Sequence, residues 1–375
     1  MTQASALVTV RPVESKRDLN RFIEFPYEHY RNDSHWVPPL RIAENERFDK
    51  KKNPFYQHAV VDLFLAERGG RVVGRVAGID DDNHNATHGD NLAFFGYFEA
   101  EDEAVARALL ETVETWAMAR GRAILRGPAN PSMNDGSGFQ LDAFDVAPYL
   151  MTPYNPPAYP HYVEGAGYTK AKDLYAWLFD HHSADTERLE RLAARAEKRY
   201  RPTIRTVDLK QFDRELGILK HIYNEAWEDN WGFVKYTEAE FDALASELKL
   251  ILDPSIVVIL EVEGEVAGLA LALPDANQLF KRMNGRLLPF GWVQLLRRRQ
   301  IINQARLPIL GVLKEYRRKG FELILINEIV KRTFARGYFQ GECSWILEDN
   351  DAMNKGIAAA GAKLYKTYRI YQKTL

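Results

Sequence analysis

The order of predicted elements is the same in the two halves of the chain, and this repetition restricts the fold more than any single motif does. Each half has two β-rich runs around a short turn, Arg68-Gly69-Gly70 in one and Glu263-Gly264 in the other. Each continues with a strand, an amphipathic helix that ends at Arg-Gly, and another strand. Each closes on a glycine and an aromatic-rich strand. The sequence therefore predicts an α+β fold made of two similar domains. Their predicted bounds are residues 1–180 and 203–375, joined by a connecting helix at 181–202.

Charge and composition exclude several classes of protein. The net charge of the 375 residues is −2, so no nucleic-acid partner is expected. The single cysteine, Cys343, excludes an internal disulfide and suits a reducing cytosol. The first residues lack the pattern of a secretory signal, and glutamates interrupt the most apolar stretch, 255–273. We expect a cytoplasmic protein and predict no metal site.

The segment Leu307–Ala335 has the pattern that most directly indicates chemistry. A strand ends near its start, a short basic loop follows, and an amphipathic helix comes next. The loop would lie beside the N–H groups and the positive dipole end of that helix, where a pyrophosphate can bind. A basic turn that caps an ordinary helix would show the same pattern. The predicted phosphate-binding residues are Arg317, Arg318, Lys319, Gly320 and Phe321.

This segment resembles the acyl-CoA motif of the GNAT N-acyltransferase superfamily, a strand followed by Arg/Gln-x-x-Gly-x-Gly/Ala and a helix. Arg317 and Gly320 match the motif, whereas Glu322 replaces its last small residue. The resemblance implies that acyl-CoA is the acyl donor. It also implies that Asn350 contacts the pantetheine or adenine part of CoA. Backbone N–H groups of Gly311, Val312 and Leu313 would hold the thioester carbonyl.

One departure from the family concerns the acid that protonates the leaving thiolate. Family members often have a tyrosine seven residues after the asparagine, where this chain has Ile357. Either Tyr365 supplies the proton from a later position, or the thiolate leaves without a protein acid. The N-terminal half departs further, because residues 99–103 hold four acids where the family has a basic phosphate loop. Since these acids repel phosphates, we expect that half not to bind CoA in the standard way.

The family resemblance places the acyl acceptor beside residues 224–233. This stretch combines two tryptophans, two asparagines and three acids. We expect Glu228 or Asp229 to anchor or deprotonate an amine, with Glu342 as the competing base. A structural alternative is that the tryptophans belong to the core and the acids are solvated. The predicted acceptor-binding residues here are Asn224, Trp227, Asn230, Trp231 and Phe233.

Two further segments are unusual for a compact domain. Residues 127–162 are rich in Pro, Asn, Gly and Tyr, and we expect them to cover the acceptor through Asn134, Tyr149, Tyr154 and Asn155. A rigid structural loop is the alternative. Residues 275–306 separate two strands with apolar and basic side chains, Trp292 among them. This segment suits a long acyl chain or peripheral contact with the inner membrane face, or it packs on the N-terminal half.

Taken with the resemblance, these patterns predict an acyl-CoA-dependent N-acyltransferase. The favoured acceptor is a lipid-like amine such as a sphingoid base, with a long-chain acyl-CoA donor, the reaction of a bacterial ceramide-forming N-acyltransferase. Three alternatives remain open. They are a small-molecule or amino-acid N-acetyltransferase, a non-catalytic GNAT-like binding or regulatory protein, and an aminoacyl-tRNA-dependent transferase of the peptidoglycan type.

Overall fold

The computed structural model describes residues 7–182 and 184–375, and its chain divides into two compact units. Unit 1 contains the chain up to residue 173 with residues 284–286 and 367–375, and unit 2 contains residues 174–283 and 287–366. These units do not correspond to a single division of the chain near residue 180, because each contains segments from distant parts of the sequence. Residues 174–180 of β9 (Thr169–Asp180) pair with β14 (Gln340–Leu347) of unit 2. Residues 371–374 of β15 (Lys363–Thr374) pair with β5 (Ile124–Gly127) of unit 1.

Unit 1 is a mixed sheet with a helix on each face. Its strands follow the order β1-β2-β3-β4-β5-β15, and all neighbours are antiparallel except β4 and β5. Gly74 on β3 faces α4, because an added Cβ would meet Val105 and Leu109, whereas the next residue, Arg75, bonds to α1 at the Phe22 carbonyl. The further elements are β1 (Thr9–Pro12), α1 (Lys16–His29), α2 (Arg41–Arg47), a 3₁₀ turn (Pro54–Gln57), β2 (Ala59–Arg68), β3 (Arg71–Asp81), α3 (Asp82–His88), β4 (Leu92–Ala100), α4 (Glu103–Ala119), β6 (Ala129–Asn130), β7 (Gly136–Ser137), β8 (Phe139–Gln140) and α5 (Ala158–Gly165).

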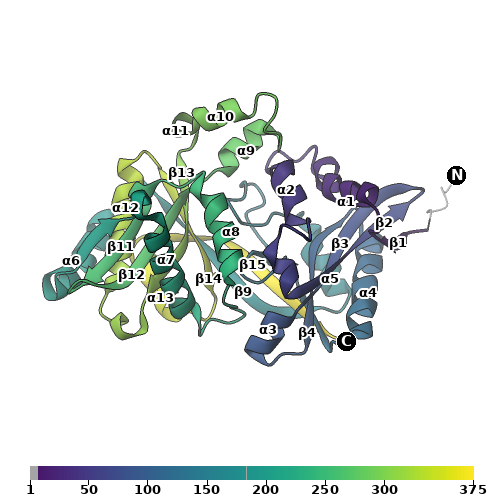
Figure 1. Cartoon of the computed structure of the whole chain (residues 1–375), viewed down its shortest axis with the longest axis horizontal. Helices are drawn as coiled ribbons and strands as arrows, with labels where there is room; N and C mark the ends of the chain where they lie inside the picture. The colour runs from purple at the N-terminus through teal and green to yellow at the C-terminus, as the bar shows by residue number, and fades with distance from the viewer. Residues whose placement is uncertain (1–6, 183) are drawn as a thin grey trace. The chain divides into compact units, whose positions relative to one another are not determined.

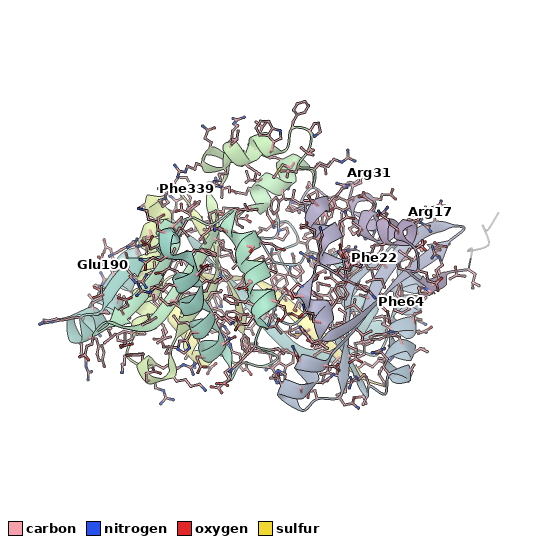
Figure 2. All side chains as sticks on the ribbon, in the orientation of Figure 1. Arg17, Phe22, Arg31, Phe64, Glu190 and Phe339 are labelled. Carbon is pink, nitrogen blue, oxygen red and sulfur yellow. The ribbon has the colours of Figure 1, made fainter. Side chains whose placement is uncertain are left out.

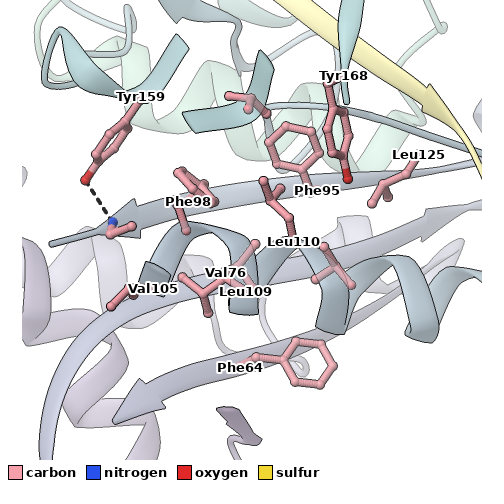
Figure 3. Packing of buried hydrophobic residues seen from close by; sticks show 14 of the residues in the cluster. Phe64, Val76, Phe95, Phe98, Val105, Leu109, Leu110, Leu125, Tyr159 and Tyr168 are labelled. Atoms are coloured by element: carbon pink, nitrogen blue, oxygen red, sulfur yellow. Dashed lines mark hydrogen bonds between the residues drawn. The ribbon is translucent and has the colours of Figure 1, made fainter. Parts of the chain in front are cut away.

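The core of unit 1 is aromatic and well packed. Figure 3 shows Phe95 and Phe98 of β4 above Leu109 and Leu110 of α4, with the Tyr159 hydroxyl accepting a hydrogen bond from the Ala100 amide. A second cluster contains Phe22 on the other side of the sheet. In Figure 2, Arg17 and Arg31 point outward. Burial of these large side chains is the main force that stabilises the unit.

Unit 2 repeats this arrangement, with its strands in the order β9-β14-β13-β12-β11-β10. Only β13 and β14 run parallel, and the other neighbours are antiparallel. The α+β fold and the hairpins predicted from the sequence are therefore confirmed (Figure 1). The further elements of unit 2 are α6 (Thr186–Tyr200), β10 (Thr203–Thr206), α7 (Phe212–Trp227), α8 (Glu238–Lys249), β11 (Val257–Val262), β12 (Glu265–Pro274), α9 (Asn277–Met283), α10 (Trp292–Leu296), α11 (Arg298–Ile301), β13 (Gln304–Val312), α12 (Phe321–Ala335), α13 (Asp351–Ala359) and 3₁₀ turns at Leu209–Gln211, Pro254–Ile256 and Lys314–Tyr316.

Two helices enclose the sheet of unit 2 on opposite faces. An added Cβ at Gly268 of β12 would meet Leu325 of α12 at 3.2 Å. An added Cβ at Gly311 of β13 would meet Trp227 of α7 at 2.7 Å. Because Gly311 is opposite Leu269, the neighbour of Gly268, these two glycines face opposite sides of the sheet. Glycine lets α7 approach β13 closely.

Three segments differ from their predicted form. The predicted connecting helix, α6, is part of unit 2, and its apolar side with Leu189 and Ala193 is buried. Glu190, labelled in Figure 2, forms an ion pair with Lys331 of α12. Residues 127–162 are not a plain loop, since they contain three short strands and the start of α5. Residues 275–306 form three short helices between β12 and β13.

Candidate active site

The two parallel strands of unit 2 separate part of the way along their length. Hydrogen-bonded pairing of β13 with β14 runs from Gln304 and Gln340 to Leu307 and Cys343 and stops there, although both strands continue. The next residue of β13 is Pro308, which has no N–H group to extend the ladder. We call this place the strand fork. Backbone groups beyond it are available to a ligand on that side of β13.

Four polar side chains meet at the strand fork. The Tyr365 hydroxyl donates a hydrogen bond to Oε2 of Glu342. The Ser344 hydroxyl donates to Oε1 of the same carboxylate at 2.5 Å, and the Arg306 guanidinium donates to the Ser344 hydroxyl at 2.9 Å. Arg306 and Glu342 are register partners on the two strands, 3.7 Å apart at their charged groups. The predicted candidates Glu342 and Tyr365 are thus in direct contact.

Burial distinguishes this cluster from an ordinary surface network. Glu342 is fully buried, and Arg306 and Ser344 are almost fully buried, whereas Tyr365 is half-buried. A buried carboxylate is stable only with a cation and hydrogen bonds around it, which Arg306, Ser344 and Tyr365 supply. The tyrosine is the member of the cluster that reaches toward solvent. It can therefore connect a bound reactant with the buried carboxylate.

Arg306 and Ser344 are functional candidates that the sequence patterns did not identify. Arg306 stands at the end of the 275–306 insertion, where it looks like one of several surface arginines. Its guanidinium lies 5.2 Å from the Trp345 ring centroid, a cation–π distance. The signal that could have found it is strand register, because Arg306 is the third residue of β13 and Glu342 is the third residue of β14.

The loop between β13 and α12 has the backbone form that the phosphate motif requires. Arg318 and Gly320 both adopt positive φ, 62° and 83°, and Gly320 is the N-cap of α12. Among the described residues, no acceptor takes a hydrogen bond from the amides of Arg318, Lys319 and Gly320. Free amides at the positive end of a 15-residue helix suit a pyrophosphate. The chain's own residues therefore fit the phosphates of CoA.

The basic side chains of this loop have different surroundings. Arg317 folds back, and it donates to the Ala226 carbonyl at 3.0 Å and to the Val312 carbonyl at 3.3 Å. It thereby fastens the loop to the C-terminal end of α7. The Arg318 side chain is exposed. Lys319 lies over the Tyr316 ring, 4.9 Å from its centroid. Arg318 and Lys319 are the cations placed to meet a phosphate.

Glu322 stands in the first turn of α12, where the family motif has a small residue. Its carboxylate accepts a hydrogen bond from its own backbone N–H. Burial raises the pKa of this carboxyl, although that hydrogen bond and the charge of Arg317 oppose the shift. An ionised Glu322 therefore competes with a phosphate for the amides at this helix end.

The backbone of β13 presents alternate amides to the two sides. The Leu313 amide donates to the Ala267 carbonyl at 3.0 Å, so it is used by the sheet. Since antiparallel pairing alternates, the amides of Leu310 and Val312 point away from β12, toward the strand fork. Of the three residues predicted to hold the thioester carbonyl through N–H groups, Val312 has its amide on the open side, whereas Gly311 and Leu313 have theirs toward β12.

The segment after β14 is built by α13. Asn350 is the N-cap of this helix, and its side chain accepts from the Met353 amide at 3.2 Å. Ile357 is buried in the core of unit 2, which explains why an apolar residue occupies the position of the family's tyrosine. A proton donor from α13 is thus excluded at that position, and Tyr365 on β15 is the hydroxyl beside Glu342.

The predicted acceptor segment lies at the end of α7 and just after it. Glu228 and Asp229 are exposed, and both form ion pairs with Lys314, at 3.3 and 3.2 Å. Hydrogen bonds from Lys235 and Lys314 lower the pKa of Glu228, which makes its carboxylate a weak base. These acids suit the binding of a cation better than the removal of its proton.

The same segment places aromatic side chains next to polar groups. Trp227 stacks on Tyr223 at 5.3 Å, and Phe233 is buried and contacts the same tyrosine. The Asn230 amide donates to the Trp227 carbonyl at 2.8 Å, and Trp231 is half-buried. The buried Oδ1 of Asn224 accepts no hydrogen bond from the residues the structure describes. An acceptor atom without a donor is a suitable partner for a substrate amine.

Candidates from the other segments lie in different surroundings. In unit 1, Tyr149 is buried, Tyr154 donates to Asp33 at 2.6 Å, and the Asn134 amide donates to Ser132. These contacts hold the segment's own conformation. Trp292 is about half-exposed on α10. The role predicted for each of them in acceptor binding stays a prediction.

In unit 1 the position equivalent to the phosphate loop is occupied by acids that the fold uses itself. Asp102 is the N-cap of α4 and accepts from the Val105 amide at 3.0 Å. Glu99 is buried and accepts hydrogen bonds from Tyr30 and Tyr159, and burial raises the pKa of this carboxyl. The helix end that could bind an anion in this unit already has one.

Within residues 7–182 and 184–375, no group of three or more His, Cys, Asp or Glu side chains is arranged to hold a metal ion. None of the helices in these residues has the length and apolar character needed to cross a bilayer.

Two known proteins are similar in sequence to this chain along almost its whole length. No protein-family model matches the chain. A protein of Caulobacter vibrioides named bacterial ceramide synthase is 38% identical, with 99% of this chain and 98% of that protein covered. Protein YghO of Escherichia coli is 35% identical, with 98% and 95% covered.

Solved structures with low sequence identity share the fold. A tandem GNAT protein from the clavulanic acid biosynthesis pathway has a TM-score of 0.57 at 14% identity, with 98% of each chain covered. A GCN5-related N-acetyltransferase from Sphaerobacter thermophilus has a TM-score of 0.53 at 12% identity, with 98% of this chain and 95% of that chain covered. The chain is therefore an acyltransferase with a tandem GNAT fold, and it belongs to the family of the Caulobacter bacterial ceramide synthase.

Proposed function

We propose that this enzyme transfers a long-chain acyl group from coenzyme A to the amine of a lipid-like acceptor such as a sphingoid base. The observation that carries the proposal is the contact of half-buried Tyr365 with fully buried Glu342 at the strand fork. Thioester aminolysis needs a group that takes a proton from the amine and a group that gives one to the thiolate. This pair can do both.

The donor would lie along the open edge of β13. Its pyrophosphate fits the amides of residues 318–320 and the charges of Arg318 and Lys319. From Leu313 back to Leu307 the strand covers roughly 20 Å, at about 3.3 Å per residue. The outward amides of Val312 and Leu310 lie along this path and suit the amide groups of the pantetheine arm. The thioester would then reach the strand fork, beside Tyr365.

The proton route uses the hydrogen bonds already present. As the amine nitrogen attacks the thioester carbon, the Tyr365 oxygen takes the amine's proton while its own proton passes to Glu342. When the C–S bond breaks, the thiolate takes a proton from Tyr365, which recovers one from Glu342. The net result is one amide and one thiol, with the enzyme unchanged. Arg306 and Ser344 are positioning residues, since they act through the carboxylate.

The acceptor amine is positively charged in water, so it needs a polar binding site and must release one proton to solvent before its nitrogen can attack. Glu228 and Asp229 are exposed acids near the phosphate loop that can attract it, and Asn224 Oδ1 can accept from it. We assign these residues to binding and Glu342 to proton transfer, because only Glu342 is buried beside a hydroxyl that can serve as relay.

The lipid character of the acceptor rests on two supports. The Caulobacter relative, 38% identical over almost the whole chain, is named a bacterial ceramide synthase. The segment 275–306 offers apolar side chains at its short helices, and an acyl chain gains about 0.8 kcal/mol for each CH₂ that it buries. An enzyme with such substrates meets them at a membrane surface, and 275–306 is the segment we expect to make peripheral contact.

A donor series with full-length enzyme tests the proposal. Acyl-CoAs from acetyl to palmitoyl are tested as donors, each with a sphingoid base and with small polar amines as acceptors. We expect kcat/KM to rise with chain length and to be highest with the sphingoid base. Trp292→Glu and Leu295→Glu should reduce that chain-length preference, whereas Leu209→Glu, an exposed leucine elsewhere in unit 2, should not. A preference for acetyl-CoA with small amines would replace the proposal by a small-molecule N-acetyltransferase.

A further inference from the structure

The short helices between β12 and β13 expose an unusual concentration of apolar side chains. Leu288, Phe290 and Leu296 are 74%, 75% and 75% exposed, and Trp292 is 47% exposed. Elsewhere in the described chain, the large exposed apolar residues are at least five positions apart in the sequence. A cluster of this kind marks a surface that has a binding partner.

Local geometry gathers these side chains on one projection of unit 2. Trp292 and Leu296 are four residues apart on α10, so they share a side of the helix. The Trp292 ring donates from Nε1 to the Pro289 carbonyl at 2.9 Å, which ties it to the turn that carries Leu288 and Phe290. Figure 1 shows α10 and α11 at the upper edge of unit 2, beyond the ends of its strands.

The charge around this projection has one sign. Between Asp275 and Glu315 the sequence has no acidic residue, and three consecutive arginines, Arg297, Arg298 and Arg299, directly follow α10. All three are exposed, and none forms an ion pair with any residue that the structure describes. Arg298 donates only to the backbone carbonyl of Leu250, at 2.9 Å. The projection therefore combines apolar tips with an uncompensated cationic rim.

We propose that this surface, Leu288–Arg299, docks on a bilayer that contains anionic phospholipid, an inference that rests on the proposed lipid acceptor for its purpose. The apolar tips enter the interface and the arginines meet lipid phosphates, the two layers that a bilayer presents together. A second copy of the chain fits less well. A two-fold contact through this surface would bring the arginine rims of both copies together and repel.

Vesicle sedimentation of the full-length protein without substrates tests the inference. We expect binding to phosphatidylcholine vesicles only when phosphatidylglycerol is added, and weaker binding as salt rises. Phe290→Glu with Leu296→Glu should reduce the affinity about tenfold or more. Leu209→Glu with Met118→Glu adds the same charge at exposed apolar residues elsewhere and should leave it unchanged.

A second pair of variants separates local from general charge. Replacing Arg297, Arg298 and Arg299 by Gln should reduce binding about tenfold or more. The same replacement at Arg188, Arg191 and Arg195, exposed on α6, should reduce it much less. Equal losses in the two triple variants, equal binding of the two glutamate variants, or no effect of phosphatidylglycerol would overturn the inference. A dimer that Phe290→Glu with Leu296→Glu dissociates would assign the surface to a second copy.

This test separates the inference from the proposed function. Acyl transfer to a sphingoid base in detergent micelles needs no bilayer. Micellar transfer without any vesicle binding would overturn the docking surface and leave the proposed function standing. Vesicle binding with the expected variant pattern, but no transfer to any lipid amine, would overturn the proposed function and leave the docking surface standing.

Discussion

At the residue scale, the fork cluster gives the sharpest expectation. Tyr365→Phe removes the hydroxyl that relays protons, and we expect kcat to fall about a hundredfold or more with little change in KM. Glu342→Gln should have a similar effect, because the amide does not accept the tyrosine proton. Tyr338→Phe is the matched control, since that hydroxyl bonds only to Asp253 in another part of unit 2. Near-normal turnover of Tyr365→Phe would remove the relay from the mechanism.

Glu322 gives a prediction about pH. Because burial raises the pKa of this carboxyl in the folded state, its ionised form is unfavourable there, and it also repels the phosphates of CoA. Glu322→Ala should therefore bind CoA several-fold more tightly at neutral pH. The difference between variant and wild type should shrink as pH falls through the raised pKa and the wild-type carboxyl becomes neutral. Calorimetric CoA titrations over this pH range measure the ratio of the variant's CoA affinity to that of the wild type. A ratio that does not vary with pH would refute the proposed repulsion between ionised Glu322 and the CoA phosphates.

The single cysteine, Cys343, is expected to take no part in the chemical step. Burial and, secondarily, the charge of Glu342 raise the pKa of Cys343 to about 12, so almost no thiolate forms at neutral pH. We expect Cys343→Ala to keep nearly full kcat and the native wild type to resist alkylation by N-ethylmaleimide. The acyl group should therefore pass directly from CoA to the amine, without an acyl-cysteine intermediate. Rapid inactivation by the reagent with protection by acyl-CoA would count against it.

At the element scale, the contact of α7 with β13 is the one that positions the acceptor segment. An alanine at Gly311 would place its Cβ 2.7 Å from Trp227 and 2.9 Å from Ala226, so α7 must move. We expect Gly311→Ala to lower the free energy of unfolding by about 1–3 kcal/mol and to reduce activity. Gly217→Ala on the exposed side of α7 meets nothing within 4 Å and should raise stability by about 0.5–1 kcal/mol. Thermal unfolding of both variants measures the contrast, and equal unfolding temperatures would contradict it.

The elements also show what a sequence can reveal. The hairpins and the amphipathic helices α4 and α12 were predicted from the sequence, because their periodicity and turn glycines are strong local signals. Helix α3, with the sequence Asp-Asn-His-Asn-Ala-Thr-His, has no apolar period and was missed. Helix α5 was missed because Pro160 and its flanking prolines indicate a loop. Both helices depend on tertiary contacts that no short window contains.

At the scale of the whole molecule, the features that the sequence did not predict also depend on contacts between distant segments. The tandem organisation was visible in the repeated element order, but the division of β9 and β15 between units depends on pairing between segments far apart in the chain. The Arg306–Glu342–Ser344 cluster likewise needs the register of β13 against β14, which local sequence does not contain. The strand, loop and helix around residues 317–321, in contrast, are local features, so their form was predicted from the sequence, and the binding of CoA phosphates there stays a prediction.

The central claim is that the chain joins an acyl group from CoA to a lipid-like amine. Mass spectrometry of the products from isotopically labelled palmitoyl-CoA and a sphingoid base, with parallel measurement of released thiol, tests it most directly. We predict one labelled N-acyl sphingoid base for each CoA thiol released by the full-length wild type, and release at least a hundredfold slower in Tyr365→Phe. Thiol release without amide, or no labelled amide with the sphingoid base, would contradict the claim.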